Sequence, residues 1–309
     1  MPQPHVSLKG SFVLAVLGFT LNLSPLITSF HTRNIYQVDA VSTQAFEYLP
    51  FISDWTQLST MASNSQPQPV GQSGNWKLKF RDEFSDTNLD TSKWHKCFWW
   101  ADQTCSIVSN GELELYNPDD VYIQNGMLRM RAQKRDMVGW NGQTYHYTSG
   151  MVMTGGQKGS TSPGFTFTYG YAEARIRIPA GQGLWPAFWL LPADYTWPPE
   201  IDVMEILGHE PSITHMTFHF SGGQQGYSWN GPDFSASWHV IGVDWEPGSI
   251  VWYVDGIERA RYTNSSTVPS KPMYLLLNLA VGGTWPGSPD SNTPFPSYYD
   301  VDYIRVWQK

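Results

Sequence analysis

The stretch "YAEARIRI", residues 171–178, decides the fold class of this chain, because its side chains alternate with a period of two. In an extended chain Tyr171, Glu173, Arg175 and Arg177 point to one side, and the alanines and isoleucines between them point to the other. This alternation is typical of an antiparallel strand that buries one of its faces. The stretch therefore predicts a protein built from antiparallel sheets.

Further strand-like runs follow one another from Trp76 onward, with turn residues between them. Asp255-Gly256 and Asn125-Gly126 each separate two such runs, and these dipeptides favour the tight turns of β-hairpins. "MYLLLNLAV" (273–281) and "VDYIRVWQ" (301–308) are two more candidate strands. No amphipathic helix of useful length and no repeat of fixed period is visible in the sequence. The sequence therefore predicts an all-β protein, an antiparallel β-sandwich.

The composition narrows the classes of ligand. The chain has 309 residues, of which 15% are charged and 15% are aromatic, with 15 Trp and 16 Tyr. Exposed Trp and Tyr are typical of sites that stack on flat ligands such as sugar rings, although many of these residues belong to the core. The net charge of −8 and the absence of any Lys/Arg cluster argue against a nucleic-acid partner.

The N-terminal region has the pattern of a targeting segment. Lys9 precedes the largely apolar residues 10–30, which predicts a secretory signal or an uncleaved membrane anchor. The stretch that ends in "MASNSQPQPVGQSG" is typical of a linker. We therefore expect a signal or anchor segment with a low-complexity linker over residues 1–74, a folded domain over residues 75–309, and a secreted protein or one anchored facing outside.

The chain has two cysteines, Cys97 and Cys105. An exported protein can join them as a disulfide that closes a short loop, and two free buried thiols are the alternative. No zinc-type spacing of Cys and His occurs, and no cofactor is expected for catalysis.

The stretch "WPPEIDVMEILGHEP", residues 197–211, places three acids within six positions. In a regular strand Glu200 and Asp202 share one face, and Glu205 points to the other face. One extra residue, a β-bulge, near Val203-Met204 would return Glu205 to the face of the other two acids. Because bulges are frequent next to active sites, the sequence predicts a row of three carboxylates on one face.

Such a row is costly unless protons or ligands compensate the repulsion between the charges, and this cost is commonly a mark of function. Two carboxyl groups a short distance apart are the equipment of a glycosidase that retains the configuration of its substrate. From spacing alone, two interpretations compete with a catalytic role: the acids form an exposed strand edge, or they are the ligands of a cation.

"EIDVME", residues 200–205, resembles the E-[IL]-D-x-x-E motif of glycoside hydrolase family 16, in the bulged form of laminarinase-like endo-β-1,3-glucanases. The resemblance extends over roughly residues 76–309. It is carried, in the family's order, by "FRDEFSD", "YGYAEARIRIPAGQGLWPAFWLLP", "WHVIGVDWEPGSIVWYVDG", "LLLNLAVGGTWPG" and "VDYIRVWQ". It implies a β-jelly-roll sandwich with a concave, aromatic-lined substrate cleft.

The resemblance also implies a role for each acid. Glu200 is then the nucleophile, Glu205 the general acid/base, and Asp202 the assisting carboxylate between them. His219 in "THMTFHF" matches a family histidine close to the acid/base; without the resemblance, a structural role is the better interpretation of a single histidine.

Further residues match substrate-binding positions of the family. The candidates are Trp185, Trp189, Trp197 and Trp285 for sugar stacking, and Asn110 and Glu114 for the donor-side sugars. Trp185 and Trp189 lie in a very apolar segment, so we expect one of these two to be a core residue.

Many members of the family carry a structural calcium ion away from the cleft. Asp302 matches the position of its carboxylate ligand, with Glu83 and Gly126 as partners through their backbone oxygens. Carbonyl and carboxylate oxygens suit calcium. The alternative is that Asp302 simply belongs to a strand end.

The resemblance therefore implies a monomeric, secreted, retaining endo-glycosidase that acts on a polysaccharide, β-1,3-glucan. The chain has "YTSGMV" (147–152) where the family often has "YTSARI", so an arginine is missing near Gly150-Met151 and the preferred glucan is open. Mixed-linkage glucan, agar or galactan as substrate, and transglycosylation, are alternatives on the same fold. A non-catalytic glucan-binding protein is a further alternative, against which the presence of all three acids argues.

Overall fold

The computed structural model describes residues 66–98, 105–156 and 164–309. Residues Asn64–Lys309 form one compact unit. The expected export segment lies outside the described residues. The described part of this unit consists of two β-sheets and two short 3₁₀ turns, Val108–Asn110 (η2) and Pro118–Asp120 (η3). This confirms the predicted all-β fold. None of the described helices is long and apolar enough to cross a membrane.

The larger sheet has ten strands in the order β14-β13-β12-β7-β16-β4-β5-β2, with β1 beside β16 and β3 beside β4. Its strands pair in antiparallel fashion, except for β2 and β5, which are parallel. The bounds are β1 Lys77–Asp82, β2 Glu114–Tyr116, β3 Val121–Gln124, β4 Met127–Val138, β5 Thr144–Ser149, β7 Gly170–Arg177, β12 His239–Glu246, β13 Ser249–Val254, β14 Ile257–Thr263 and β16 Ser297–Gln308.

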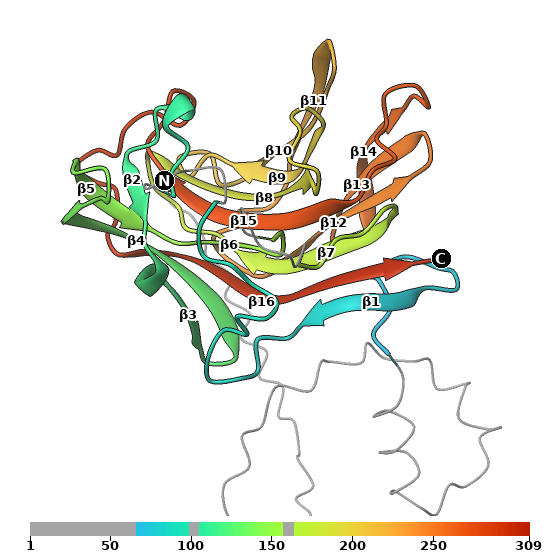
Figure 1. Cartoon of the computed structure of the whole chain (residues 1–309), viewed down its shortest axis with the longest axis horizontal. Coiled ribbons are helices and arrows are strands. Elements are labelled where there is room, and N and C mark those ends of the chain that lie inside the picture. Colours follow the sequence, from blue (N-terminus) through green and yellow to red (C-terminus); the bar gives the residue numbers. More distant parts are fainter. Residues whose placement is uncertain (1–65, 99–104, 157–163) are drawn as a thin grey trace, which may run out of the picture. The chain divides into compact units, whose positions relative to one another are not determined.

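The smaller sheet has six strands in the order β11-β10-β9-β8-β15-β6. Figure 1 shows this sheet as a layer above β7 and β16 of the larger one. The bounds are β6 Met151–Met153, β8 Leu184–Pro192, β9 Glu200–Ile206, β10 Ile213–Phe220, β11 Gly223–Asn230 and β15 Met273–Val281.

Both predicted hairpin turns are present. Asn125 and Gly126 between β3 and β4, and Asp255 and Gly256 between β13 and β14, all have positive φ angles between 51° and 75°. Two consecutive residues in this region are the requirement of the type I′ turn, which Gly satisfies without strain and Asn or Asp tolerates. The sequence therefore fixes the register of these two hairpins locally.

The main core lies between the two sheets and follows the alternation seen in the sequence. Ala172, Ala174 and Ile176 of β7 are fully buried there, as are Phe188 of β8 and Ile201 of β9. Burial of apolar area of this kind is the main favourable contribution to folding. The core also fixes which residues of β8 and β9 face the other way, toward the outer surface of the smaller sheet.

The outer face of β7 is less exposed than its pattern predicts, because the chain before β1 covers part of it. Tyr171 packs with Trp76 and Trp307 in a separate apolar cluster, and Glu173 is fully buried. The backbone N–H of Val70 donates to Glu173 at 3.0 Å. Residues 66–74 are therefore docked on the sandwich, and the domain begins earlier than the expected boundary at residue 75.

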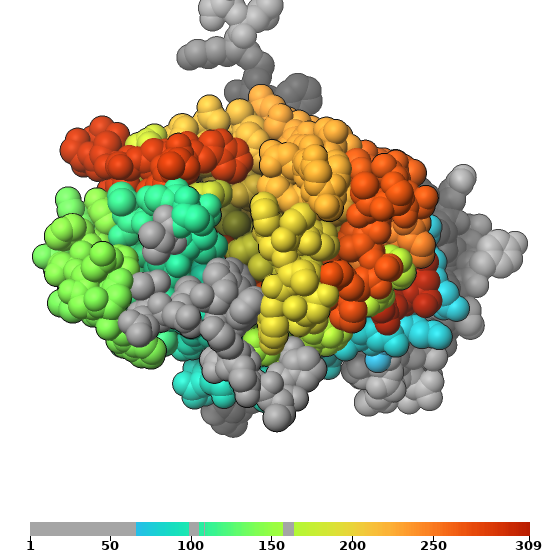
Figure 2. Space-filling view, turned by 45° about the horizontal axis from the view of Figure 1, so that its top comes forward, coloured from blue at the N-terminus to red at the C-terminus, as the bar shows by residue number. Residues whose placement is uncertain are grey.

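The outer face of the smaller sheet is covered on one side only. Phe98 and Tyr116 pack there against Trp189 of β8 and form a second apolar cluster with Tyr274 of β15. Cys97 and Cys105 of the covering segment are joined as a disulfide, one of the two predicted possibilities. The face over β8, β9 and β10 stays open. In Figure 2 the resulting hollow lies between the teal residues near 110 and the yellow residues of β10 and β11.

Strand β9 contains the bulge that its acids require. Asp202 pairs with Thr217 and Glu205 pairs with His215, so that two residues of β9 lie opposite Met216 alone. The pairing with β8 shifts at the same place. A bulge frees backbone groups from the ladder. Here the carbonyl of Asp202 accepts a hydrogen bond at 2.9 Å from the indole of Trp252, a fully buried residue of the opposite sheet.

We predict that Trp252→Phe lowers the free energy of unfolding by about 2–3 kcal/mol, because it leaves a buried carbonyl without a donor and a small cavity. It should also reduce any activity of the acid row, because the bulge loses its support. The matched control is Trp245→Phe, which removes a buried indole donor to the carbonyl of Pro269. Urea unfolding and kcat measured together decide: equal losses of kcat in both variants would contradict a specific role of Trp252.

Candidate active site

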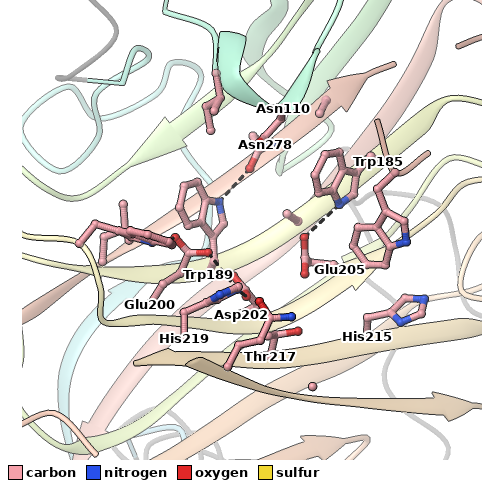
Figure 3. Close-up of a pocket in the computed structure, with 18 of the residues that line it drawn as sticks. Asn110, Trp185, Trp189, Glu200, Asp202, Glu205, His215, Thr217, His219 and Asn278 are labelled. Atoms are coloured by element: carbon pink, nitrogen blue, oxygen red, sulfur yellow. Dashed lines mark hydrogen bonds and ion pairs between the residues drawn. The ribbon is translucent and has the colours of Figure 1, made fainter. Parts of the chain in front are cut away.

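The bulge places Glu200, Asp202 and Glu205 on the same face of β9, as predicted, where they point into the open half of the smaller sheet (Figure 3). The cleft over them has a volume of about 960 Å³. Besides the three acids, its lining includes Asn110, Glu112, Trp185, Trp189, Tyr195, Trp197, His215, Thr217, His219, Gln224, Asn278 and Trp285.

Burial and mutual repulsion act on all three carboxyl groups. Burial raises the pKa of Glu200 well above its ordinary value, and the charges of Asp202 and Glu205 raise it further. Burial, followed by repulsion from Asp202, likewise raises the pKa of Glu205 well above its ordinary value. Burial also raises the pKa of Asp202, although its contact with His219 opposes the rise. The row therefore retains protons at pH values where free carboxyl groups have lost them.

Hydrogen-bond donors contact both ends of the row. The indole of Trp197 donates to Glu200 at 3.0 Å, and Nε2 of His219 lies 3.5 Å from the other oxygen of Glu200. Glu205 accepts from the indole of Trp185 at 3.1 Å. Donors favour the ionised form of a carboxyl group. Each end of the row therefore has one indole donor, and the roles of nucleophile for Glu200 and proton donor for Glu205 stay predictions.

His219 lies elsewhere than the resemblance implied. It pairs across the strands with Glu200, and its Nε2 is 3.1 Å from Asp202. The histidine opposite Glu205 is His215. The correction follows from strand register, which places His219 beside the nucleophile candidate and the middle acid, not beside the acid/base candidate.

Glu200, Asp202 and His219 also form a group whose ligand atoms lie within 4.8 Å of one another, a distance that a metal ion could bridge. The same atoms are already in contact within the acid row. Their arrangement is explained by that row, so we assign no metal to them.

The tryptophans divide as expected. Trp189 is only 7% exposed and donates to Asn278 at 2.8 Å, so it is the core member of the apolar pair and forms the cleft floor. Trp197 is 66% exposed beside Glu200. Trp285 is 43% exposed and packs edge-to-face on Trp185, with 5.5 Å between the ring centroids. Exposed indole faces therefore flank both ends of the acid row.

The segment near residue 110 reaches the cleft, but Glu114 does not. Asn110 lines the cleft as predicted, and its side-chain amide donates to Glu112 at 2.9 Å. Glu114 is fully buried, and its carboxylate accepts from the backbone N–H of Val281 at 2.7 Å. Glu112, two residues earlier, is the acid that lines the cleft, and we correct the assignment accordingly.

Several lining residues did not emerge from the sequence analysis, among them His215, Thr217, Gln224 and Asn278. For His215 and Thr217 the signal is present in "THMTFHF", where they and His219 alternate with apolar residues and so share one face of β10. The alternation became informative only once the neighbouring strand was known. Met151, where the family often has arginine, is fully buried beneath the covered half of the sheet.

The residues expected to hold calcium lie on β16 or next to the ends of strands that pair with it. β16 pairs with β4 as far as Val301 and with β1 from Ile304 onward. Asp302 therefore lies at the junction where Gly126 precedes β4 and Glu83 follows β1. One carboxylate oxygen of Asp302 accepts from Arg175 at 2.9 Å. A calcium ion at this junction, held by carbonyl and carboxylate oxygens, stays a prediction.

We predict that the two indole donors control opposite limbs of a bell-shaped pH profile of kcat/KM. Trp197→Phe removes a donor from Glu200, so its pKa rises and the acid limb moves to higher pH. Trp185→Phe raises the pKa of Glu205, so the alkaline limb moves to higher pH. Shifts of about half a unit to one unit are expected. If each variant moved the other limb, the assignment of nucleophile and proton donor would have to be exchanged.

Comparison with known proteins agrees with this geometry. The family model described as "Glycosyl hydrolases family 16" matches residues 110–305. A second model, "Beta-glucan synthesis-associated protein SKN1/KRE6/Sbg1", matches residues 7–193 and thus overlaps the first.

Among curated relatives, the endo-1,3-1,4-beta-glycanase ExsH of Rhizobium meliloti is 36% identical over 245 residues, which are 74% of this chain and 51% of the relative. The chain spans about half the length of the curated relatives it matches first.

Among solved structures, the endo-beta-1,3-glucanase from Pyrococcus furiosus is 38% identical with a TM-score of 0.67, covering 75% of this chain and 94% of that one. The catalytic domain of an endo-1,3-beta-glucanase (laminarinase) from Thermotoga petrophila is 34% identical with a TM-score of 0.69, covering 76% of this chain and 98% of that one. With the acid row, the cleft and these matches, the chain belongs to glycosyl hydrolases family 16.

Proposed function

We propose that this protein is a retaining endo-glycoside hydrolase that cleaves β-1,3-glucan within the chain. The observation that carries the proposal is the row of three carboxyl groups on the bulged strand, set in an open cleft with exposed tryptophans at both ends. An open cleft admits the interior of a polymer, and indole faces bind the apolar faces of sugar rings. The names of the relatives and of the neighbouring structures support β-glucan as the substrate.

The first half of the reaction uses both ends of the row. The carboxylate of Glu200 attacks the anomeric carbon and forms a glycosyl ester, while Glu205 gives its proton to the leaving oxygen. Asp202 lies between them with a raised pKa and in contact with His219, so it limits the charge that accumulates in the row. The leaving glucan segment departs with the proton of Glu205.

The second half reverses these roles. The ionised Glu205 accepts a proton from water, and the water oxygen attacks the anomeric carbon as the bond to Glu200 breaks. The product keeps the configuration of the substrate, because two displacements occur at the same carbon. Both acids return to their starting states, so the proton count closes over one turnover.

We predict that Glu200→Gln abolishes the release of reducing ends from laminarin while the fold is preserved, because the amide is a similar size but a poor nucleophile. The control is Glu210→Gln, at an exposed acid on the turn that follows β9, which should retain activity. A panel of laminarin, curdlan, lichenan, agarose and galactan then defines the substrate. The proposal is contradicted if the wild-type protein releases products from none of them.

We predict that Glu205→Ala lowers kcat on natural glucan by about 10²- to 10⁴-fold, the usual contribution of a general acid. Aryl glycosides with good leaving groups need little protonation, so their first step should be much less affected. The ratio of the two losses is measured by pre-steady-state kinetics. Equal losses on both kinds of substrate would count against Glu205 as the acid.

Transglycosylation is a second candidate, favoured by the match to the model for glucan synthesis-associated proteins over residues 7–193. In it, a sugar hydroxyl replaces water in the second half of the reaction. Chromatography of the products at high oligosaccharide concentration distinguishes the two: products longer than the substrate indicate transfer, and shorter products alone indicate hydrolysis.

We also infer that the protein acts outside the cell, as a secreted or anchored monomer. The apolar residues 10–30 and the Cys97–Cys105 disulfide support export, since disulfides persist in oxidising compartments. Fractionation of expressing cells, with the mass of the exported chain, would separate cleavage from anchoring.

A further inference from the structure

Two acids beside the cleft take no part in the proposed reaction. Glu112 lines the cleft, and Glu114 lies behind it in β2, fully buried. The amide of Asn110 donates to Oε1 of Glu112 at 2.9 Å, and the N–H of Val281 donates to Oε2 of Glu114 at 2.7 Å. The remaining oxygens, Oε2 of Glu112 and Oε1 of Glu114, are buried and receive no hydrogen bond from any other described group.

The two carboxyl groups, two residues apart in one extended segment, each raise or lower the pKa of the other. Two carboxylates cannot form a hydrogen bond, because each is only an acceptor, and two neighbouring buried charges repel strongly. One proton between them resolves both problems at once, because a carboxylic acid donates to a carboxylate in a strong, charge-assisted bond.

The electrostatics agree with this geometry. Burial, and then the charge of Glu112, raise the pKa of Glu114 well above its ordinary value. Burial also raises the pKa of Glu112, although contacts with Glu114, Asn110, the backbone of Ile107 and the hydroxyl of Tyr116 oppose the rise. Among the described residues, Tyr116 is the titratable group that faces the pair, and burial keeps its phenol neutral by raising its pKa.

We propose that Glu112 and Glu114 share one proton in a single buried hydrogen bond, and that this bond positions the Asn110–Glu112 wall of the cleft against the bound glucan. Glu114 is thus a positioning residue that acts through Glu112. The ligand in this inference rests on the proposed function, whereas the shared proton does not.

The backbone contacts of Glu112 and Glu114 explain why a hydrogen bond between their side chains would affect the whole cleft wall, residues 110–112. Glu114 is anchored to Val281 at the end of β15, and Glu112 forms a bridge with Gly282. The carbonyl of Asn110 accepts from the N–H of Thr284 at 2.8 Å, next to Trp285. The wall and the loop that carries the exposed indole are therefore joined at the place where the proton is shared.

A second connection runs to the cleft floor. The hydroxyl of Tyr116, which lies against the acid pair, accepts from Asn278 at 2.9 Å, and Asn278 accepts from the indole of Trp189 at 2.8 Å. Loss of the proton would place two charges beside this chain of hydrogen bonds. The wall would then separate from Glu114 or admit water.

The proton is tested by stability as a function of pH. Because the folded pair holds a proton that the unfolded chain has lost above about pH 5, its contribution to stability is present at low pH and falls as pH rises. Glu114→Gln supplies a permanent N–H donor at nearly the same size and removes this dependence. The unfolding equilibrium constant of the wild type, divided by that of Glu114→Gln, should rise about tenfold per pH unit above about pH 5.

The positioning role is tested by binding in the Glu200→Gln background, with a short β-1,3-gluco-oligosaccharide as probe. Adding Glu114→Gln should leave Kd within about twofold, whereas adding Glu114→Ala should weaken binding about fivefold or more, the effect of at least one lost hydrogen bond. Glu173→Ala is the control: it truncates another buried acid, whose pKa burial raises to about 7, on the far sheet. It should lower stability without changing Kd.

The outcomes separate the claims. A pH-independent ratio of unfolding constants overturns the shared proton. An unchanged Kd in a folded Glu114→Ala variant, or equal weakening by Glu173→Ala, overturns the positioning role. If the Glu200→Gln parent binds no glucan, the proposed substrate fails and so does the wall's role toward it, while the stability ratio still decides whether the proton is shared.

Discussion

The site depends on one backbone irregularity, the bulge at residues 203–204 of β9. Without it, the alternation of the strand would send Glu205 into the core, where an acid without partners is strongly unfavourable. With it, three acids share a face, and the carbonyl that the bulge frees is satisfied by Trp252 from the opposite sheet. The fold and the chemistry therefore meet at this bulge, because the second sheet stabilises the geometry on which the acid row depends.

The row also requires compensation for its charges. Indole N–H groups at each end, His219 near the middle and retained protons reduce the repulsion. We propose the same solution behind the wall of the cleft, where burial raises the pKa of both Glu112 and Glu114. An acidic chain can thus bury several carboxyl groups near one ligand, provided that protons and donors keep the number of charges low. A neutral glucan suits such a cleft better than an anionic polymer does.

Much of this could be predicted from the sequence, because it was encoded locally. The Asn-Gly and Asp-Gly turns, the alternation of "YAEARIRI" and the bulge implied by the spacing of Glu200 and Glu205 all follow from short-range rules. Contacts between distant segments were not predictable in this way. The burial of Glu173 depends on the chain near Val70. Glu114 is held away from the cleft by its hydrogen bond to Val281 at the end of β15, so that Glu112 lines the cleft in its place. The place of His219 depends on strand register, which a single strand does not specify.

The stereochemistry of the first product tests the central claim most directly. If the bulge sets Glu200 and Glu205 at the separation for a double displacement, each cleavage of a β-linked glucan releases a β-anomer before mutarotation. Proton NMR of fresh laminarin digests, recorded within the first minutes, distinguishes the two anomers. The account predicts that the β-anomeric signal of the new reducing ends appears first and the α signal follows slowly. An α signal that appears first would mean a single displacement by water, and would contradict the role of Glu200 as nucleophile.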